Sequence, residues 1–179
     1  MDDFVASGTG TALRLRHRFE ATPERVFAAW TRPDALRLWW CPAGWQPAEI
    51  EVNLWLGGTY RLAMIRESGT QRITVHGHFL EIEPASRLVY TWRWDGAFPD
   101  MPETIVTVDF RAVTGGTEIS LRQEVLELPM CTRLLSGWLA ACGRMAEVME
   151  KRADCALRTT PDCYGPSREA ANRPDAEAV

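Results

Sequence analysis

The sequence predicts an α+β domain with a seven-stranded, curved antiparallel sheet, two short N-terminal helices, and a long C-terminal helix over the concave face of the sheet. Three observations predict this class. An early helical segment ends at Trp39-Trp40-Cys41-Pro42, a long central region alternates between apolar and polar residues, and helical spacing returns around Gly137-Trp138. A period of two indicates strands, whereas apolar residues three or four positions apart indicate helices.

The N-terminal part of the domain is predicted as one strand followed by two short helices. Apolar and charged residues alternate from Leu13 to Phe19, which is typical of a strand with one buried face. Thr22-Pro23-Glu24 then provides a hydroxyl N-cap, a proline at the first helical position and an acidic first turn. Arg32-Pro33-Asp34 interrupts this helix, and the second short helix carries Trp39-Trp40.

The remaining strands are predicted between residues 48 and 125, because the apolar residues of this region recur at every second position. Glycine, proline and small polar residues separate them and mark turns. The predicted turns are Leu56-Gly57-Gly58-Thr59, Glu67-Ser68-Gly69-Thr70, Glu83-Pro84-Ala85-Ser86, Asp95-Gly96 and Thr114-Gly115-Gly116-Thr117.

A long amphipathic helix is predicted from Pro129 to Arg152, where a wide apolar stripe recurs at helical spacing. Beyond it, prolines and glycines punctuate a stretch that is poor in large apolar residues. We therefore expect a flexible lead-in over residues 1–10, a folded domain over 11–152, and a flexible tail over 153–179.

Composition excludes several classes of function. With 179 residues and 46% hydrophobic residues, the chain suits one domain with a proper core. A net charge of −4 argues against nucleic-acid binding, which usually needs a basic surface. No apolar run approaches the roughly 20 residues of a membrane span, and no secretory signal is evident. Five irregularly spaced cysteines suit reduced thiols, so we expect a cytoplasmic protein.

Several short stretches together resemble one known family. Through the order of these stretches along residues 11–152, the chain resembles the family named after the activator of the heat-shock-protein-90 ATPase. That family lies within the START and birch-pollen-allergen-like superfamily (SRPBCC), whose fold is called helix-grip. The stretches that carry the resemblance are Ala21–Phe27, Leu38–Pro42, Leu56–Tyr60, Gly77–Ile82, Leu88–Trp92 and Ser136–Trp138.

The resemblance implies a scaffold around an internal hydrophobic pocket. Its members include small-molecule carriers, resistance or biosynthetic proteins, cyclase-like enzymes and co-chaperone domains, and they share no catalytic motif that could be transferred. Many relatives have a histidine on the last strand, where this chain has Gln123. An acid–base role for that histidine therefore does not transfer.

The apolar faces of the predicted strands and of the last helix define a candidate ligand pocket. Its aromatic and methionine side chains would form an adaptable apolar wall, although the same side chains could simply fill a core. His17 and Gln123 fall on inward-facing positions, where each needs a hydrogen-bond partner. That partner could be a ligand, a water molecule or a backbone group, or the two side chains could bond each other. His17 titrates near neutrality and is the best catalytic candidate. The predicted lining is His17, Tyr60, Met64, Phe79, Tyr90, Trp92, Trp94, Gln123, Trp138, Cys142, Met145 and Met149.

Other motifs have simpler interpretations. His76 and His78 share one face of a strand, but that face is predicted to meet solvent and no third ligand accompanies them, so we expect no metal and no cofactor. Phe98 and Met101 could cap the mouth of a pocket or anchor a hairpin. The Trp39-Trp40 pair is expected to pack under the edge of the sheet.

Three functions are compatible with these observations. The leading hypothesis is a binding module for a small, largely apolar or aromatic molecule. The second is an enzyme of cyclase, dehydratase or hydrolase type on the same scaffold, with His17 as base and Gln123 or Tyr90 orienting the substrate. The third is a co-chaperone-like interaction module with a role in stress response. We expect a monomer or homodimer.

Overall fold

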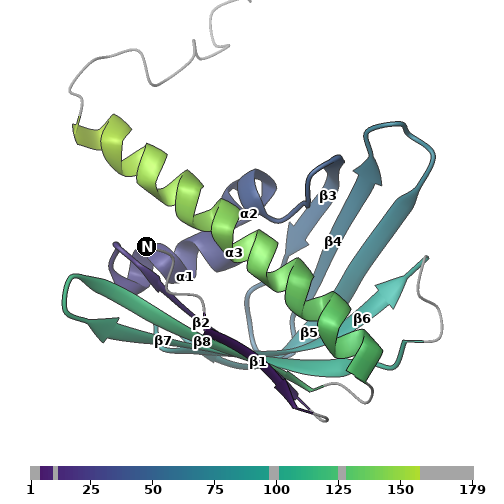
Figure 1. Cartoon of the computed structure of the whole chain (residues 1–179), viewed down its shortest axis with the longest axis horizontal. Helices are drawn as coiled ribbons and strands as arrows, with labels where there is room; N and C mark the ends of the chain where they lie inside the picture. The colour runs from purple at the N-terminus through teal and green to yellow at the C-terminus, as the bar shows by residue number, and fades with distance from the viewer. Residues whose placement is uncertain (1–4, 10–11, 97–100, 125–127, 158–179) are drawn as a thin grey trace, which may run out of the picture.

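The computed structural model describes residues 5–9, 12–96, 101–124 and 128–157. These residues form an antiparallel sheet that curls around one long helix, with two short helices beside it (Figure 1). In chain order the elements are β1 (Val5–Thr9), β2 (Ala12–Phe19), α1 (Pro23–Thr31), α2 (Pro33–Trp39), β3 (Trp45–Val52), β4 (Thr59–Arg66), β5 (Arg72–Glu83), β6 (Arg87–Asp95), β7 (Thr104–Val113), β8 (Gly116–Glu124) and α3 (Leu128–Leu157).

The sheet has the strand order β1-β2-β8-β7-β6-β5-β4-β3, and every neighbouring pair is antiparallel. From β3 to β8, each strand pairs with the next one in the chain. The exception is β2, which pairs with β8 across the whole domain, with His17 opposite Ile119 and Leu13 opposite Gln123. This pairing joins the start of the domain to its last strand.

The predicted fold class is confirmed, and all seven predicted strands are present with the two short helices and the long last helix. The sheet gains an eighth strand, because residues 5–9 form β1 along the edge of β2, with Val5 opposite Arg16 and Thr9 opposite Ala12. These residues were expected in a flexible lead-in, since Val-Ala-Ser-Gly-Thr shows no apolar alternation. Likewise, α3 continues past the expected boundary at residue 152 to Leu157. Residues 158–179 of the expected tail lie outside the described residues.

The core lies on the concave face of the sheet. Leu15, Leu121, Val108 and Leu88 stand side by side across β2, β8, β7 and β6, and each is at most 1% exposed. The intervening arginines of β2 point to the opposite face and are exposed. Because paired residues of neighbouring strands face the same side, this row follows directly from the alternation in sequence.

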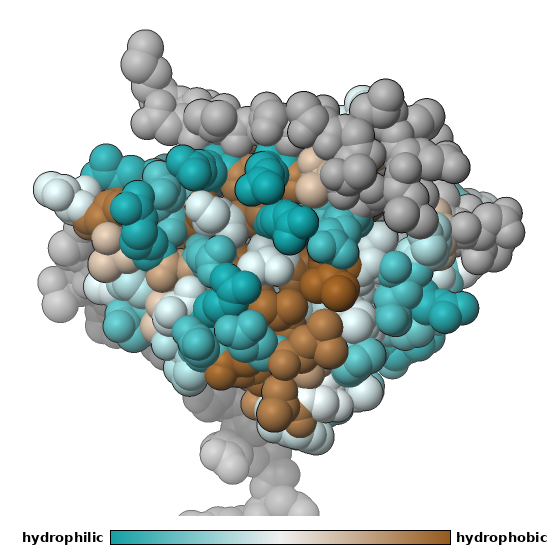
Figure 2. Space-filling model, turned by 90° about the horizontal axis from the view of Figure 1, so that it is seen from below, coloured by the Kyte–Doolittle hydropathy of each residue, from teal (hydrophilic) through white to brown (hydrophobic). Residues whose placement is uncertain are grey.

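The outer face of the sheet is mixed in polarity. Figure 2 views the molecule from below the sheet, and hydrophobic residues gather there over one area bordered by hydrophilic ones. The large apolar side chains that are exposed in the described residues include Leu80 on β5 and Ile105 on β7.

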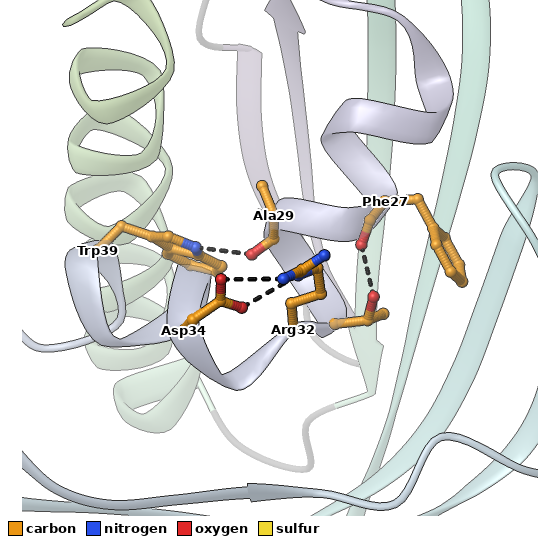
Figure 3. A network of polar contacts seen from close by, with 6 residues as sticks. Phe27, Ala29, Arg32, Asp34 and Trp39 are labelled. Carbon is orange, nitrogen blue, oxygen red and sulfur yellow. Dashed lines mark hydrogen bonds and ion pairs between the residues drawn. The ribbon is translucent and has the colours of Figure 1, made fainter. Parts of the chain in front are cut away.

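The junction between α1 and α2 is held by short-range polar contacts (Figure 3). The Arg32 side chain forms an ion pair with Asp34, with Nε 3.0 Å from Oδ1, and the Trp39 indole Nε1 donates to the Ala29 carbonyl at 2.9 Å. A proline starts each of the two helices, where the missing N–H is not needed. These contacts hold α2 against α1 and turn Trp39 into the core.

Gly77 lies on β5 where the backbone of β6 passes close by. A Cβ atom at this position would lie 2.1 Å from the Thr91 carbonyl oxygen, which is backbone and cannot move aside easily. The register between the same two strands shifts between Phe79 and Glu81. A glycine is therefore required here by space.

We expect Gly77→Ala to destabilise the domain by about 1–3 kcal/mol, the usual cost of overpacking, or more, because the backbone of β6 must shift. The matched control is Gly143→Ala on α3, where no atom lies within 4 Å of the added Cβ. That change should be neutral or stabilise by up to about 1 kcal/mol, because alanine favours a helix over glycine. Urea unfolding followed by circular dichroism measures both. Equal midpoints for Gly77→Ala and the wild type would contradict this account of the β5–β6 approach.

Candidate functional site

A buried hydrogen-bond chain fastens α3 to the sheet. The Trp138 indole Nε1 donates to the Gln123 side-chain oxygen at 2.7 Å, and the Gln123 amide nitrogen donates to the Thr104 hydroxyl at 2.9 Å. Gln123 is fully buried on β8, and Thr104 begins β7. A buried amide is costly unless its groups are bonded, and here both ends of the amide have partners.

Trp138 is also the centre of a cluster of tryptophans. Its ring stacks on Trp30 with centroids 5.8 Å apart, and it lies 5.0 Å from Trp92 and 6.2 Å from Trp40. These rings come from α1, β6, the end of α2 and α3. Their separations fall in the range in which aromatic pairs attract each other beyond simple burial. The cluster therefore links every layer of the domain.

A cavity of about 150 Å³, partly open to solvent, lies between the sheet and α3. An apolar cavity of about this volume holds one benzene-sized ring. A second void, beneath the tryptophans, has a volume of only about 30 Å³. The residues that line the larger cavity are Trp40, Pro42, Met64, Trp92, Trp94, Met101, Leu134, Gly137, Trp138, Ala141 and Arg144.

The sequence-predicted lining divides between these spaces. Four of the predicted residues, Met64, Trp92, Trp94 and Trp138, line the larger cavity. Tyr60, Phe79 and Tyr90 line only the small void, together with Trp92 and Trp138. The hydroxyl groups of the two tyrosines are engaged inside the core: Tyr60 donates to the Thr91 carbonyl at 2.6 Å, and Tyr90 accepts from the Trp30 indole at 3.3 Å.

The other predicted residues lie away from the larger cavity. Cys142 is fully buried and lines none of the three cavities described. Met145 and Met149 line a separate groove of about 320 Å³ between α3 and the two short helices. Gln123 is bonded to Trp138, and His17 packs edge-on against Phe19 with centroids 4.5 Å apart. Neither His17 nor Gln123 lines a described cavity.

His17 and Gln123 are both buried, but they do not meet. His17 pairs with Ile119, whereas Gln123 pairs with Leu13, so the two residues lie at different levels of the β2–β8 ladder. Four residues along a strand correspond to about 13 Å. The Gln123 side chain bonds instead to Thr104 and Trp138, so the alternative in which the two polar side chains bond each other is wrong.

Sequence reasoning missed Arg144, the one charged residue in the cavity wall. A charged residue does not count toward the apolar stripe of the helix, yet Arg144 lies three positions after Ala141 and seven after Gly137, and so on the same helical face. Its Nε donates to the Trp39 carbonyl at 3.0 Å, and Nη2 lies 3.5 Å from the Trp40 carbonyl. These are carbonyls at the C-terminal end of α2. Burial lowers the pKa of Arg144.

The structure places most of the remaining sequence motifs, namely Met101 of the Phe98/Met101 loop and the histidines His76 and His78. Met101 lines the cavity, while Phe98 lies outside the described residues. His76 Nε2 is 3.2 Å from an Asp95 carboxylate oxygen, and His78 Nδ1 is 3.2 Å from the Thr91 hydroxyl. Across the described residues, no three histidine, cysteine or carboxylate side chains gather as a metal site would require.

No described helix combines the length and the apolar character that crossing a bilayer demands.

The sheet curls around one long C-terminal helix, and two short helices follow β2, the strand that pairs with β8. This arrangement defines the helix-grip class of the START and birch-pollen-allergen-like superfamily. Within that class, the family model described as "Activator of Hsp90 ATPase homolog 1-like protein" matches residues 20–150. The chain belongs to this family. No curated protein matches it.

Solved structures agree with this assignment. A protein from Rhodobacter sphaeroides is 26% identical with a TM-score of 0.73, and the alignment covers 83% of this chain and 98% of that one. A protein from Chromobacterium violaceum is 27% identical with a TM-score of 0.70, covering 78% and 98%. The AHSA1 protein from Silicibacter pomeroyi is 25% identical with a TM-score of 0.67, covering 82% and 98%.

Trp138→Phe should lower the free energy of unfolding by about 1–3 kcal/mol, because it leaves the buried Gln123 oxygen without its donor. The ring contacts are largely kept, so the loss reports mainly on the hydrogen bond. The control is Trp55→Phe, at a side chain that is 60% exposed, where a change within about 0.5 kcal/mol is expected. Urea unfolding of the two variants and the wild type measures these free energies. Equal losses of unfolding free energy in both variants would refute the anchoring role of Trp138.

The stability of the domain should fall as the pH rises above about 9. Burial raises the pKa of Cys142 from 9.0 to about 12 and that of Cys41 to about 11, and it raises the pKa of Tyr60 well above 10.0. Below about pH 9 the folded and unfolded states both keep these protons, but above it only the unfolded state releases them. Each fully buried group of this kind then removes up to about 1.4 kcal/mol per pH unit, and the partly exposed Cys41 thiol removes less, because solvent screens its charge. Urea midpoints at about pH 8, 9 and 10 test this; a midpoint that stays constant or rises would contradict it.

Proposed function

We propose that this domain binds a small, largely apolar or aromatic molecule, about one aromatic ring in size, in the cavity between the sheet and α3. The observation that carries the proposal is the cavity of about 150 Å³ walled by Trp40, Trp92 and Trp138. The family supports it, since the SRPBCC scaffold is typically a ligand-binding fold.

The wall suits a flat apolar guest. Tryptophan rings offer both faces and edges to an aromatic ligand, and such pairs contribute about 0.5–1.5 kcal/mol beyond the burial of area. Met64 and Met101 adapt their unbranched side chains to the shape of a guest. The cavity is smaller than most drug-sized ligand pockets, which span roughly 300–1,000 Å³. A monocyclic compound is therefore favoured over a sterol or a long lipid.

The enzyme alternative has no comparable support. Its three candidate residues, His17, Gln123 and Tyr90, do not line the larger cavity. Gln123 and Tyr90 share one row of the sheet with Val106 between them, which separates the two by about 10 Å. The Tyr90 hydroxyl is engaged with Trp30, and burial raises its pKa, so it is a poor acid or base near neutrality.

The co-chaperone-like alternative stays a second proposal, because one observation favours it. The turn between β3 and β4 exposes Trp55 by 60% and Leu56 by 73%. Backbone hydrogen bonds from Gly57 to Phe79 and from Phe79 to Gly58 hold this turn against β5. If the turn contacts an ATPase client, a Trp55→Ser/Leu56→Ser double variant should abolish the change in client ATPase rate. The proposal fails if the wild-type domain leaves that rate unchanged.

Ligand binding is tested by thermal denaturation with p-cresol, a neutral single-ring probe. The melting temperature of the wild type should rise with probe concentration, because a ligand that binds only the folded state adds about 2.7 kcal/mol at 100 times its Kd. Gly137→Leu places a side chain at the cavity wall and should abolish the shift.

The matched control for this test is Gly143→Leu, at the other α3 glycine with open space around its Cβ position. Gly143 lines none of the cavities described, so this variant should keep the shift of the wild type. The absence of any shift in the wild type at millimolar probe, or an equal shift in Gly137→Leu, would overturn the proposed site.

A further inference from the structure

The wall of the proposed ligand cavity contains one charged group, the guanidinium of Arg144. It is half-buried, and no carboxylate among the described residues lies within the 4.0 Å of an ion pair. Burial of this charge lowers the pKa of the arginine, and the more distant carboxylate of Glu147 offsets the effect only in part. The other charged residue types are absent from the wall.

The position of the guanidinium is fixed, and much of its bonding capacity is unused. Its Nε and Nη2 are directed at the Trp39 and Trp40 carbonyls, which anchor the group at the end of α2. A guanidinium has five N–H donors in a planar fork, so these two contacts leave about three donors for another partner. An anchored arginine with free donors at a cavity is well prepared to bind an anion.

The side chains of the wall carry hydrogen-bond donors. The Nε1 atoms of Trp40 and Trp92 have no hydrogen-bond partner among the described residues, but they are closed to solvent, so the accessible donors of the wall are those of Arg144. An indole N–H can only donate. None of the eleven lining residues has a side-chain oxygen, so the polar nitrogen groups of the wall are all donors. The wall therefore favours a ligand that supplies acceptors.

We infer that the ligand of this cavity is an aromatic monocarboxylate, whose ring lies against the wall formed by Trp92 and Trp138 and whose carboxylate pairs with Arg144. This inference rests on the proposed function. A carboxylate only accepts hydrogen bonds, and its two oxygens match the planar fork of a guanidinium. The volume of about 150 Å³ accommodates one ring, and the partly open side leaves room for the charged group.

The test compares two probes of nearly equal shape, 4-methylbenzoate and the neutral 4-methylbenzamide, by isothermal titration calorimetry at about pH 7.5. The wild type should bind the acid at least about tenfold more tightly than the amide, a difference of about 1.4 kcal/mol. Added salt should weaken binding of the acid and leave binding of the amide nearly unchanged.

Variants of Arg144 then assign the preference to this side chain. Arg144→Met should remove the preference for the acid and leave the affinity for the amide within about threefold, while Arg144→Lys should restore part of the preference, because it keeps a point charge but loses the fork. Because Arg144 also contacts the end of α2, the urea midpoint of each variant is measured first. The acid–amide comparison on the wild type needs no variant and stays decisive if both variants unfold.

The outcomes separate this inference from the function on which it rests. Equal affinity of the wild type for acid and amide would overturn the carboxylate inference and leave the binding function intact. A preference for the acid that survives in folded Arg144→Met would likewise overturn the role of Arg144. If the wild type binds neither probe and p-cresol gives no thermal shift, the proposed function itself fails.

Discussion

The hydrogen bond from Trp138 to Gln123 is the interaction on which the rest of the structure depends. It ties α3 to β8, and through Thr104 to β7, inside a core where an unpaired amide would be costly. The same indole ring contacts Trp30, Trp40 and Trp92. One side chain therefore sets the distance between helix and sheet, and with it the shape of the cavity.

Most of the fold could be predicted from the sequence because its signals are local. Alternation from Leu13 to Phe19 gives β2 its buried and exposed faces, and prolines mark the starts of α1 and α2. The strand β1 could not be predicted, because residues 5–9 are mostly small, and the strand is held by its pairing with β2. Pairing with the neighbouring strand, rather than intrinsic preference, forms that element.

The candidate site was predicted only in part, for a similar reason. Period two places His17 and Gln123 on the buried side, but only the register of β2 against β8 shows that they lie at different levels. Arg144 was missed because a charged residue beside an apolar stripe usually reaches solvent. Here the carbonyls at the end of α2, which come from more than one hundred positions earlier in the chain, hold it in the cavity wall. No local pattern reports such a contact.

The closure of the sheet by β2 and β8 has a consequence for how the chain folds. Arg18 reaches the Thr114 carbonyl across 96 positions of sequence, whereas β3 to β8 can assemble as successive hairpins. Closing so long a segment costs chain entropy before any contact compensates for it, and proteins dominated by such remote pairings fold slowly. The hairpins are thus expected to form early, and the rate at which the native domain appears is governed by the late arrival of its first residues at its last strand.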